Sequence, residues 1–247
     1  CLQPMVWIAT IVAVAFLGGP LTVRAAQSAP ALDEDGSRYR AIPATGLPTR
    51  LNQRLASGAT SLQFDPTNGY LTALLREWKI SAAIQLLVAS KTSPHKLLIS
   101  PHNPRAVYFN DQAAIAYVPG SDTLEIMAFD ERLGVSFHTL AQRRAEHPEL
   151  RRDDRCLECH VSGRTLNVPG WLARSFSTLN DGDIDSLSGR MITHRTPFAE
   201  RWGGYYVTGA PRGLPHRGNL FGPDSPLATA GDRPVLENLP EHLDIAR

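Results

Sequence analysis

Residues 106–140 read AVYFNDQAAIAYVPGSDTLEIMAFDERLGVSFHTL, and this stretch decides the fold. Four short runs rich in β-forming residues alternate with residues that form turns, such as Asn110-Asp111 and the Pro-Gly-Ser-Asp of residues 119–122. The four runs are Val107–Phe109, Ala113–Val118, Leu124–Phe129 and Val135–Leu140. The pattern predicts a small antiparallel meander.

Weaker signals flank this stretch on both sides. Apolar residues at three- and four-residue spacing after Asn68 predict a helix, and the short apolar run at 82–89 fits a helix or a strand. Three prolines in residues 91–104 indicate an extended, looped connection. Tyr205–Thr208, bracketed by two glycines, predict a further strand. The helical positions are Tyr70, Leu71, Leu74, Leu75 and Trp78.

The composition is that of a globular protein with a sizeable core. The 247 residues are 43% hydrophobic and 20% charged, which suits one or two domains. Lys and Arg total 25 against 24 Asp and Glu, a formal net charge of +1 that argues against nucleic acid as a partner. Three cysteines are too few for a scaffold held together by disulfides.

The first 25 residues predict a signal peptide. Residues 5–17 carry no charge and are followed by Gly18, Gly19 and Pro20, but the basic region that opens a signal peptide is missing. The alternative is a retained anchor, and only then would the protein contact a membrane. Either interpretation places the rest of the chain in the periplasm or outside the cell. Residues 26–60, rich in Ser, Ala, Pro, Gly and Arg, predict a linker or loosely ordered arm.

One motif carries chemistry. Cys156, Cys159 and His160 form C-x-x-C-H, the attachment site of c-type haem. Two cysteines three residues apart can each form a thioether with one haem vinyl group, and the following histidine can then reach the iron as the proximal ligand. The motif predicts one covalent haem c per chain.

Two other uses of the cysteine pair remain open. A structural zinc site usually needs two such pairs, and the chain has no second pair. A disulfide or a redox dithiol followed by a chance histidine is the plainer alternative, although a thioredoxin-type dithiol normally follows a strand, whereas residues 151–155 are polar.

The sequence leaves the second axial ligand open. Two of the candidates are Met191, which fits core packing, and His194, which we rank first. The remaining candidates are histidines on either side of the motif: His102, His138 and His216.

The chain resembles a family of exported bacterial c-type cytochrome domain proteins. The resemblance covers roughly residues 91–219 and rests on the order of several motifs around C-x-x-C-H. These motifs are Pro104–Asp111, Leu124–Ile126, Gly134–Leu140, Thr193–Pro197 and Arg201–Gly209. The resemblance implies that Cys156, Cys159 and His160 hold haem and that His194 and His216 stand where the family also has histidines. It also implies that the family's chains continue past Arg247 with further histidine-bearing helices.

Together these observations predict an α+β fold. A small antiparallel sheet region would be followed by a loop-rich or helical haem-binding segment, unlike a plain small cytochrome c, and residues 61–247 would form the c-type cytochrome domain. The predicted function is transfer of single electrons between periplasmic redox partner proteins. The alternative is a haem enzyme, or a gas- or peroxide-binding protein, with an open distal site.

Overall fold

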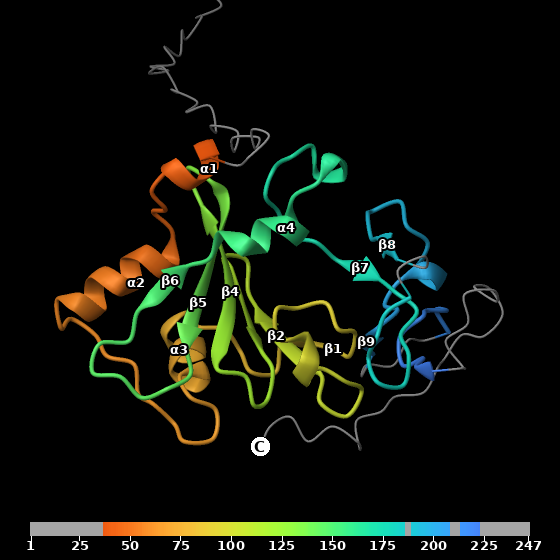
Figure 1. The fold of residues 1–247 in the computed structure, drawn as a ribbon, viewed down its shortest axis with the longest axis horizontal. Coiled ribbons are helices and arrows are strands. Elements are labelled where there is room, and N and C mark those ends of the chain that lie inside the picture. The colour runs from red at the N-terminus through yellow and green to blue at the C-terminus, as the bar shows by residue number, and fades with distance from the viewer. Residues whose placement is uncertain (1–36, 186–188, 208–212, 223–247) are drawn as a thin grey trace, which may run out of the picture.

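The computed structural model describes residues 37–185, 189–207 and 213–222, and its centre is a seven-stranded antiparallel sheet (Figure 1). The strand order is β6-β5-β4-β3-β2-β1-β9. The strands are β1 (Gln85–Val88), β2 (Arg105–Phe109), β3 (Ala113–Tyr117), β4 (Thr123–Asp130), β5 (Gly134–Ala141), β6 (Leu150–Arg152) and β9 (Tyr205–Tyr206). The predicted meander is confirmed, since its four runs are β2 to β5.

The turns of the meander form as their residues predict. The Asn110 side-chain oxygen accepts hydrogen bonds from the backbone N–H groups of Gln112 and Ala113, both at 2.9 Å, and so turns β2 into β3. Asp130 does the same between β4 and β5, accepting from Arg132 and Leu133 at 2.9 and 3.0 Å. Local side-chain chemistry therefore determines which strands are neighbours.

Two helices, α2 (Leu47–Ala56) and α3 (Leu71–Glu77), cover one face of the sheet. Residue 48, near the start of α2, is a proline, whose fixed φ suits that position. The apolar residues of both helices pack against alternate residues of the strands and form the main core, and α3 confirms the helix predicted after Asn68. The fully buried members of this core are Leu74, Ala113, Ile115, Leu124 and Ala128.

The interpretation of residues 26–60 as a loosely ordered arm is wrong for residues 37–60. Helix α1 (Ser37–Ala41) and helix α2 lie there, and the side chains of Tyr39 and Leu51 are 1% and 2% exposed. The Tyr39 hydroxyl donates to the carbonyl of Val135, almost a hundred residues along the chain. Local composition does not reveal such long-range contacts. The predicted signal peptide lies outside the described residues.

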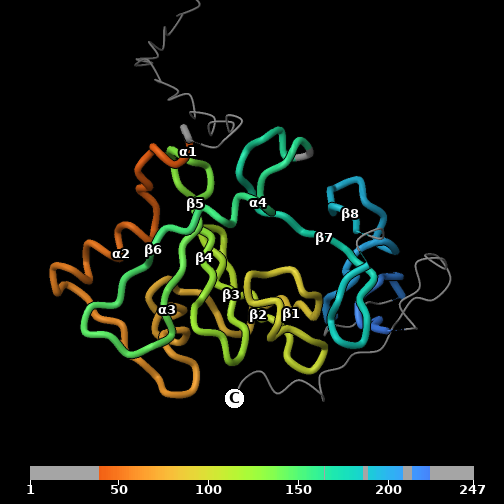
Figure 2. Tube along the Cα trace, viewed as in Figure 1, coloured from red at the N-terminus to blue at the C-terminus, as the bar shows by residue number. Residues whose placement is uncertain are grey.

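The opposite face of the sheet is only partly covered. A second apolar cluster joins α1 to the β4–β5 end of this face and to a short helix, α4 (Leu157–His160). After α4 the chain passes through β7 (Arg174–Ser175) and β8 (Arg190–Met191), which pair with each other (Figure 2). It then reaches β9 at the far edge of the sheet (Figure 1). The described residues also form four 3-10 turns: Lys96–Leu98, Asp154–Cys156, Gly163–Thr165 and Phe198–Glu200.

The fold is thus a mixture of helices and strands in which the sheet dominates, in agreement with the predicted class and sheet. The ambiguous run at 82–89 is the strand β1, and the strand predicted at Tyr205–Thr208 is β9, described as far as residue 206. Within the described ranges, no helix is both long and apolar enough to cross a membrane.

Candidate haem-attachment site

The C-x-x-C-H motif lies on one continuous helical turn above the sheet. The 3-10 turn Asp154–Cys156 runs directly into α4, so Cys156 and Cys159 are three residues apart on one helical surface. The Asp153 side chain caps the start of the 3-10 turn by accepting a hydrogen bond from the N–H of Arg155. The buried side chain of Leu157 packs α4 against the sheet. Helix α4 ends at Val161, which adopts an extended conformation.

The two thiols have different surroundings. Cys156 packs against the apolar cluster on the sheet, whereas Cys159 is exposed, and both are free. Burial, and next the nearby Asp153 carboxylate, raise the pKa of the Cys156 thiol to about 12. A dithiol that exchanges disulfides needs a thiolate, and its attacking cysteine usually has a lowered pKa. The raised pKa of Cys156 therefore does not favour a thioredoxin-type dithiol.

The His160 ring is held at one nitrogen. Its Nδ1 lies 2.9 Å from the carbonyl oxygen of Gly170, so Nδ1 carries the proton and donates. The ring of Phe137, on β5, contacts it at a centroid distance of 4.9 Å. Burial is the main cause that lowers the pKa of His160, and the positive charges of Arg105 and Arg174 contribute. The imidazole is therefore neutral near pH 7, and its lone pair is on Nε2.

These residues fit a c-type haem. Iron binds a neutral imidazole through the nitrogen that carries no proton, and a carbonyl acceptor at the other nitrogen fixes that tautomer. His160 meets both conditions, and no described residue makes a hydrogen bond to its Nε2. Two free thiols three residues apart, directly before this histidine, supply the covalent attachments.

A half-buried ion pair lies on the sheet face near this turn. Arg105, on β2, donates from Nη1 to Glu125, on β4, at 3.1 Å, and Ser93 donates to the same carboxylate. The Nε of Arg105 is buried and has no hydrogen-bond partner among the described residues. A second cation, Arg174, donates from Nη2 to the carbonyl of Cys159 at 2.7 Å, where a positive charge stabilises the end of a helical turn.

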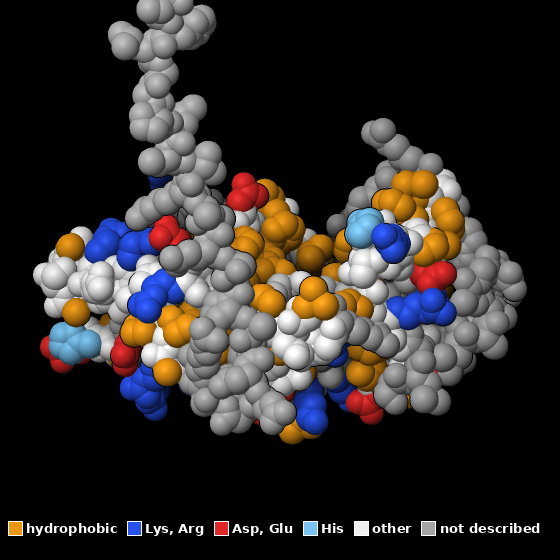
Figure 3. Space-filling model, turned by 90° about the horizontal axis from the view of Figure 1, so that it is seen from above, with side chains coloured by type: hydrophobic (Ala, Val, Ile, Leu, Met, Phe, Trp, Pro, Cys, Tyr) orange, Lys and Arg blue, Asp and Glu red, His pale blue; other side chains and the backbone are white. Residues whose placement is uncertain are grey.

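Apolar side chains gather around this site. Figure 3 shows them in the middle of the surface seen from above, where the molecule is hollowed between its two ends. Trp171 stacks on Phe129 with ring centroids 5.5 Å apart, beside the same apolar cluster. Trp202, the other tryptophan that follows the motif, contacts Tyr205 at 5.8 Å in the segment that leads to β9.

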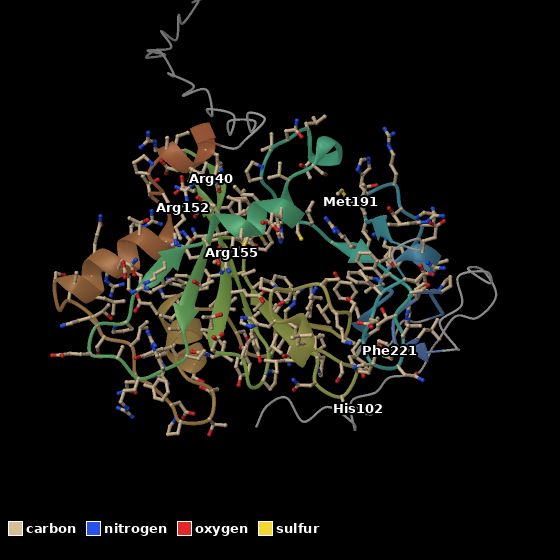
Figure 4. The ribbon with its side chains drawn as sticks, in the orientation of Figure 1. Arg40, His102, Arg152, Arg155, Met191 and Phe221 are labelled. Carbon is tan, nitrogen blue, oxygen red and sulfur yellow. The ribbon has the colours of Figure 1, made fainter. Side chains whose placement is uncertain are left out.

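The arginines before the motif are largely neutralised by neighbours. Arg152 pairs with Asp154 at 2.8 Å and also donates to the carbonyls of Tyr39 and Ile42, which ties α1 to β6. Arg155 pairs with Asp153 at 2.6 Å. Both side chains are labelled in Figure 4. The charged run therefore has a structural role in connecting α1, β6 and α4.

The structure separates the candidates for a second axial ligand. His194 is exposed in a turn beyond β8, and His216 is buried with its Nδ1 accepting from the N–H of Gly218 at 3.1 Å. His138 lies on β5 with its side chain on the face covered by α2 and α3, because adjacent Phe137 points to His160. Met191 is half-buried on β8.

No sequence pattern predicts the residues that position the motif. Gly170, Phe137 and Arg174 carry no spacing signal, because their contacts with α4 depend on how the chain returns over the sheet. The Arg105–Glu125 pair had a weak signal, since both are charged residues within predicted strands or at their ends. Such residues in a sheet often mark a polar interaction on one face.

Comparison of the chain with family models, with curated proteins and with solved structures finds no match. In the described part of the chain, no three His, Cys, Asp or Glu side chains are grouped to hold a metal ion by themselves.

Proposed function

We propose that this chain is an exported c-type cytochrome that carries single electrons. Cys156 and Cys159 would hold the porphyrin as thioethers, and His160 would bind the iron through Nε2. The observation that supports this most directly is the hydrogen bond from His160 Nδ1 to Gly170, since it leaves Nε2 with a free lone pair in the residue that follows the cysteine pair. Bound haem would supply a one-electron iron couple.

The chain's own residues would orient and tune this group. Phe137 supports the imidazole from the sheet, and Arg174 fixes the carbonyl of Cys159, so the turn is held on both sides. The exposed position of Cys159 would leave part of the attachment site at the surface, where a redox partner protein can approach. Export, inferred from residues 5–17, would place those partners in the periplasm or outside the cell.

The test is expression with a system that attaches c-type haem, followed by denaturation and a pyridine haemochrome assay. We expect one covalent haem per chain in the wild type. Cys156→Ser and Cys159→Ser should each leave one thioether and shift the haemochrome band, and the double variant should lose the haem on denaturation. His147→Gln is a matched control for His160→Gln, because the His147 side chain is 86% exposed.

The spin state of the oxidised protein then separates two kinds of haem protein. A six-coordinate, low-spin spectrum supports electron transfer. A high-spin spectrum with rapid peroxide or CO binding would instead support the haem enzyme or gas-binding protein. Correctly exported protein without covalent haem would contradict both and leave a domain with a Cys156–Cys159 disulfide.

A further inference from the structure

The strand β8 holds Met191 beside the segment that is bonded to the haem-attachment turn. Met191 pairs with Arg174 in the β7–β8 register, and the next residue, Ile192, donates its N–H to the carbonyl of Ala173 at 2.8 Å. Arg174 in turn donates to the carbonyl of Cys159. One strand pairing and one hydrogen bond therefore connect Met191 to the turn that carries His160.

The Met191 side chain has no packing role that accounts for it. It is half-buried and belongs to neither hydrophobic cluster of the described structure, although methionine usually fills gaps in a core. Figure 4 shows it extending from β8 toward α4. A thioether is a soft, neutral donor, and this one lies on a strand that is connected through Arg174 to the turn that would hold the iron.

The histidines are less suited to bind the same iron. His194 follows β8 in an exposed turn, where Arg201 donates to the carbonyls of Thr193 and His194, both at 3.4 Å. His102 lies at the other end of the molecule from α4 (Figure 4). His216 accepts a backbone hydrogen bond at Nδ1, so its Nε2 carries the proton in the neutral ring and offers no lone pair.

Met127, the other methionine of the described residues, has a packing role. It pairs with Phe137 across β4 and β5 and packs in the cluster beneath α4. Its side chain is therefore already part of a packed apolar cluster, whereas Met191 belongs to neither cluster of the described structure.

We infer that the sulfur of Met191 is the second axial ligand of the haem iron, opposite His160. The inference rests on the proposed function. A thioether ligand favours ferrous iron more than a second histidine does and raises the reduction potential. The protein would then be a carrier that accepts electrons readily rather than a low-potential donor.

The test compares four variants of the haem-loaded protein by absorption and EPR spectroscopy. In the wild type we expect a low-spin ferric spectrum with the weak far-red band that a thioether ligand gives. Met191→Leu, which keeps the volume but not the sulfur, should lose this band, become largely high-spin and bind CO rapidly when reduced. Met127→Leu and His194→Gln should keep the wild-type spectrum.

Met191→His tests whether the loss of the far-red band in Met191→Leu is caused by misfolding alone. It should stay low-spin, lose the far-red band and have a lower reduction potential than the wild type, which a position distant from the iron would not produce. The inference is overturned if Met191→Leu keeps the band, if His194→Gln changes the spin state, or if the wild type is already high-spin. Each of these results leaves covalent haem intact, whereas its absence in the wild type would overturn the proposed function as well.

Discussion

Phe137 and His138 are neighbours on β5 whose side chains point to opposite faces of the sheet. Phe137 supports the His160 ring, while His138 is 4% exposed in the face covered by α2 and α3, within hydrogen-bond distance of the Ser136 hydroxyl. Burial is the main cause that lowers the pKa of His138 from 6.5 to about 4, and the Arg152 charge adds to it. Phe137 therefore contacts the cysteine–histidine turn, whereas His138 is part of the core.

Lower pH should destabilise the protein through His138. The unfolded chain binds a proton here below about pH 6.5, but the folded chain does so only below about pH 4. Between these values the unfolded state binds more protons, so the free energy of unfolding falls as pH falls, by about 3 kcal/mol at most. We expect His138→Gln to show a smaller loss than the wild type in urea denaturation between about pH 7 and about pH 4.5.

The exposed His147→Gln variant is the control, and its pH dependence should match that of the wild type. Equal slopes for His138→Gln and the wild type would contradict the prediction. Buried His216 also has a lowered pKa, so only the difference between variants isolates His138.

At the scale of elements, a side chain of α2 forms hydrogen bonds with the backbone of β6, the strand at one edge of the sheet. Asn52 donates to the carbonyl of Leu150 at 2.8 Å and accepts from its N–H at 2.9 Å, as a neighbouring strand would do for β6. The edge strand β6 has only three residues, so this pair of bonds matters for its position.

Removing this amide should loosen β6. Asn52→Ala leaves buried backbone groups of Leu150 without these partners, and we expect a loss of about 1–3 kcal/mol in the free energy of unfolding. Exposed Gln53→Ala, on the same helix, should cost far less. Hydrogen exchange at the Leu150 amide should speed up only in Asn52→Ala, and equal exchange in both variants would refute the role of Asn52.

The strands of the meander could be predicted because their signal is local. Each has a run of β-forming residues and a turn residue such as Asn110 or Asp130 whose own side chain makes the turn. Strand β6 and helices α1 and α2 could not, since polar or mixed segments become regular there through contacts with distant residues such as Leu150 with Asn52. The cysteine–histidine motif was visible from spacing alone, but its supports, Gly170 and Arg174, depend on tertiary structure.

At the scale of the whole molecule, Gly204 joins the segment after the motif back to the sheet. Its carbonyl accepts from the N–H of Ala89 at 2.8 Å, and its φ is +85°. A Cβ here would lie 2.9 Å from both Ser90 and Thr178, closer than packed side chains allow. Glycine is therefore required where the chain enters β9.

Gly204→Ala should detach this segment while the meander stays folded. Gly120→Ala is a matched control, because Gly120 has the same φ of +85° but no neighbouring atom within 4 Å of the place that an added methyl group would take. We expect Gly204→Ala to lose about 1–3 kcal/mol more than the control, from the added clash. Limited proteolysis should then cut within residues 189–207 of Gly204→Ala first, and identical digestion of both variants would contradict this.

The place of β9 in the sheet has a consequence for the order of assembly. The outer partner of β1, which ends at Val88, begins only at Tyr205, so this side of the sheet stays open until the chain beyond the cysteine–histidine turn has folded back. Until then the turn lies on a sheet with an unpaired edge. Under the proposed function, attachment of a bulky group is therefore sterically easier before β9 pairs with β1 than after.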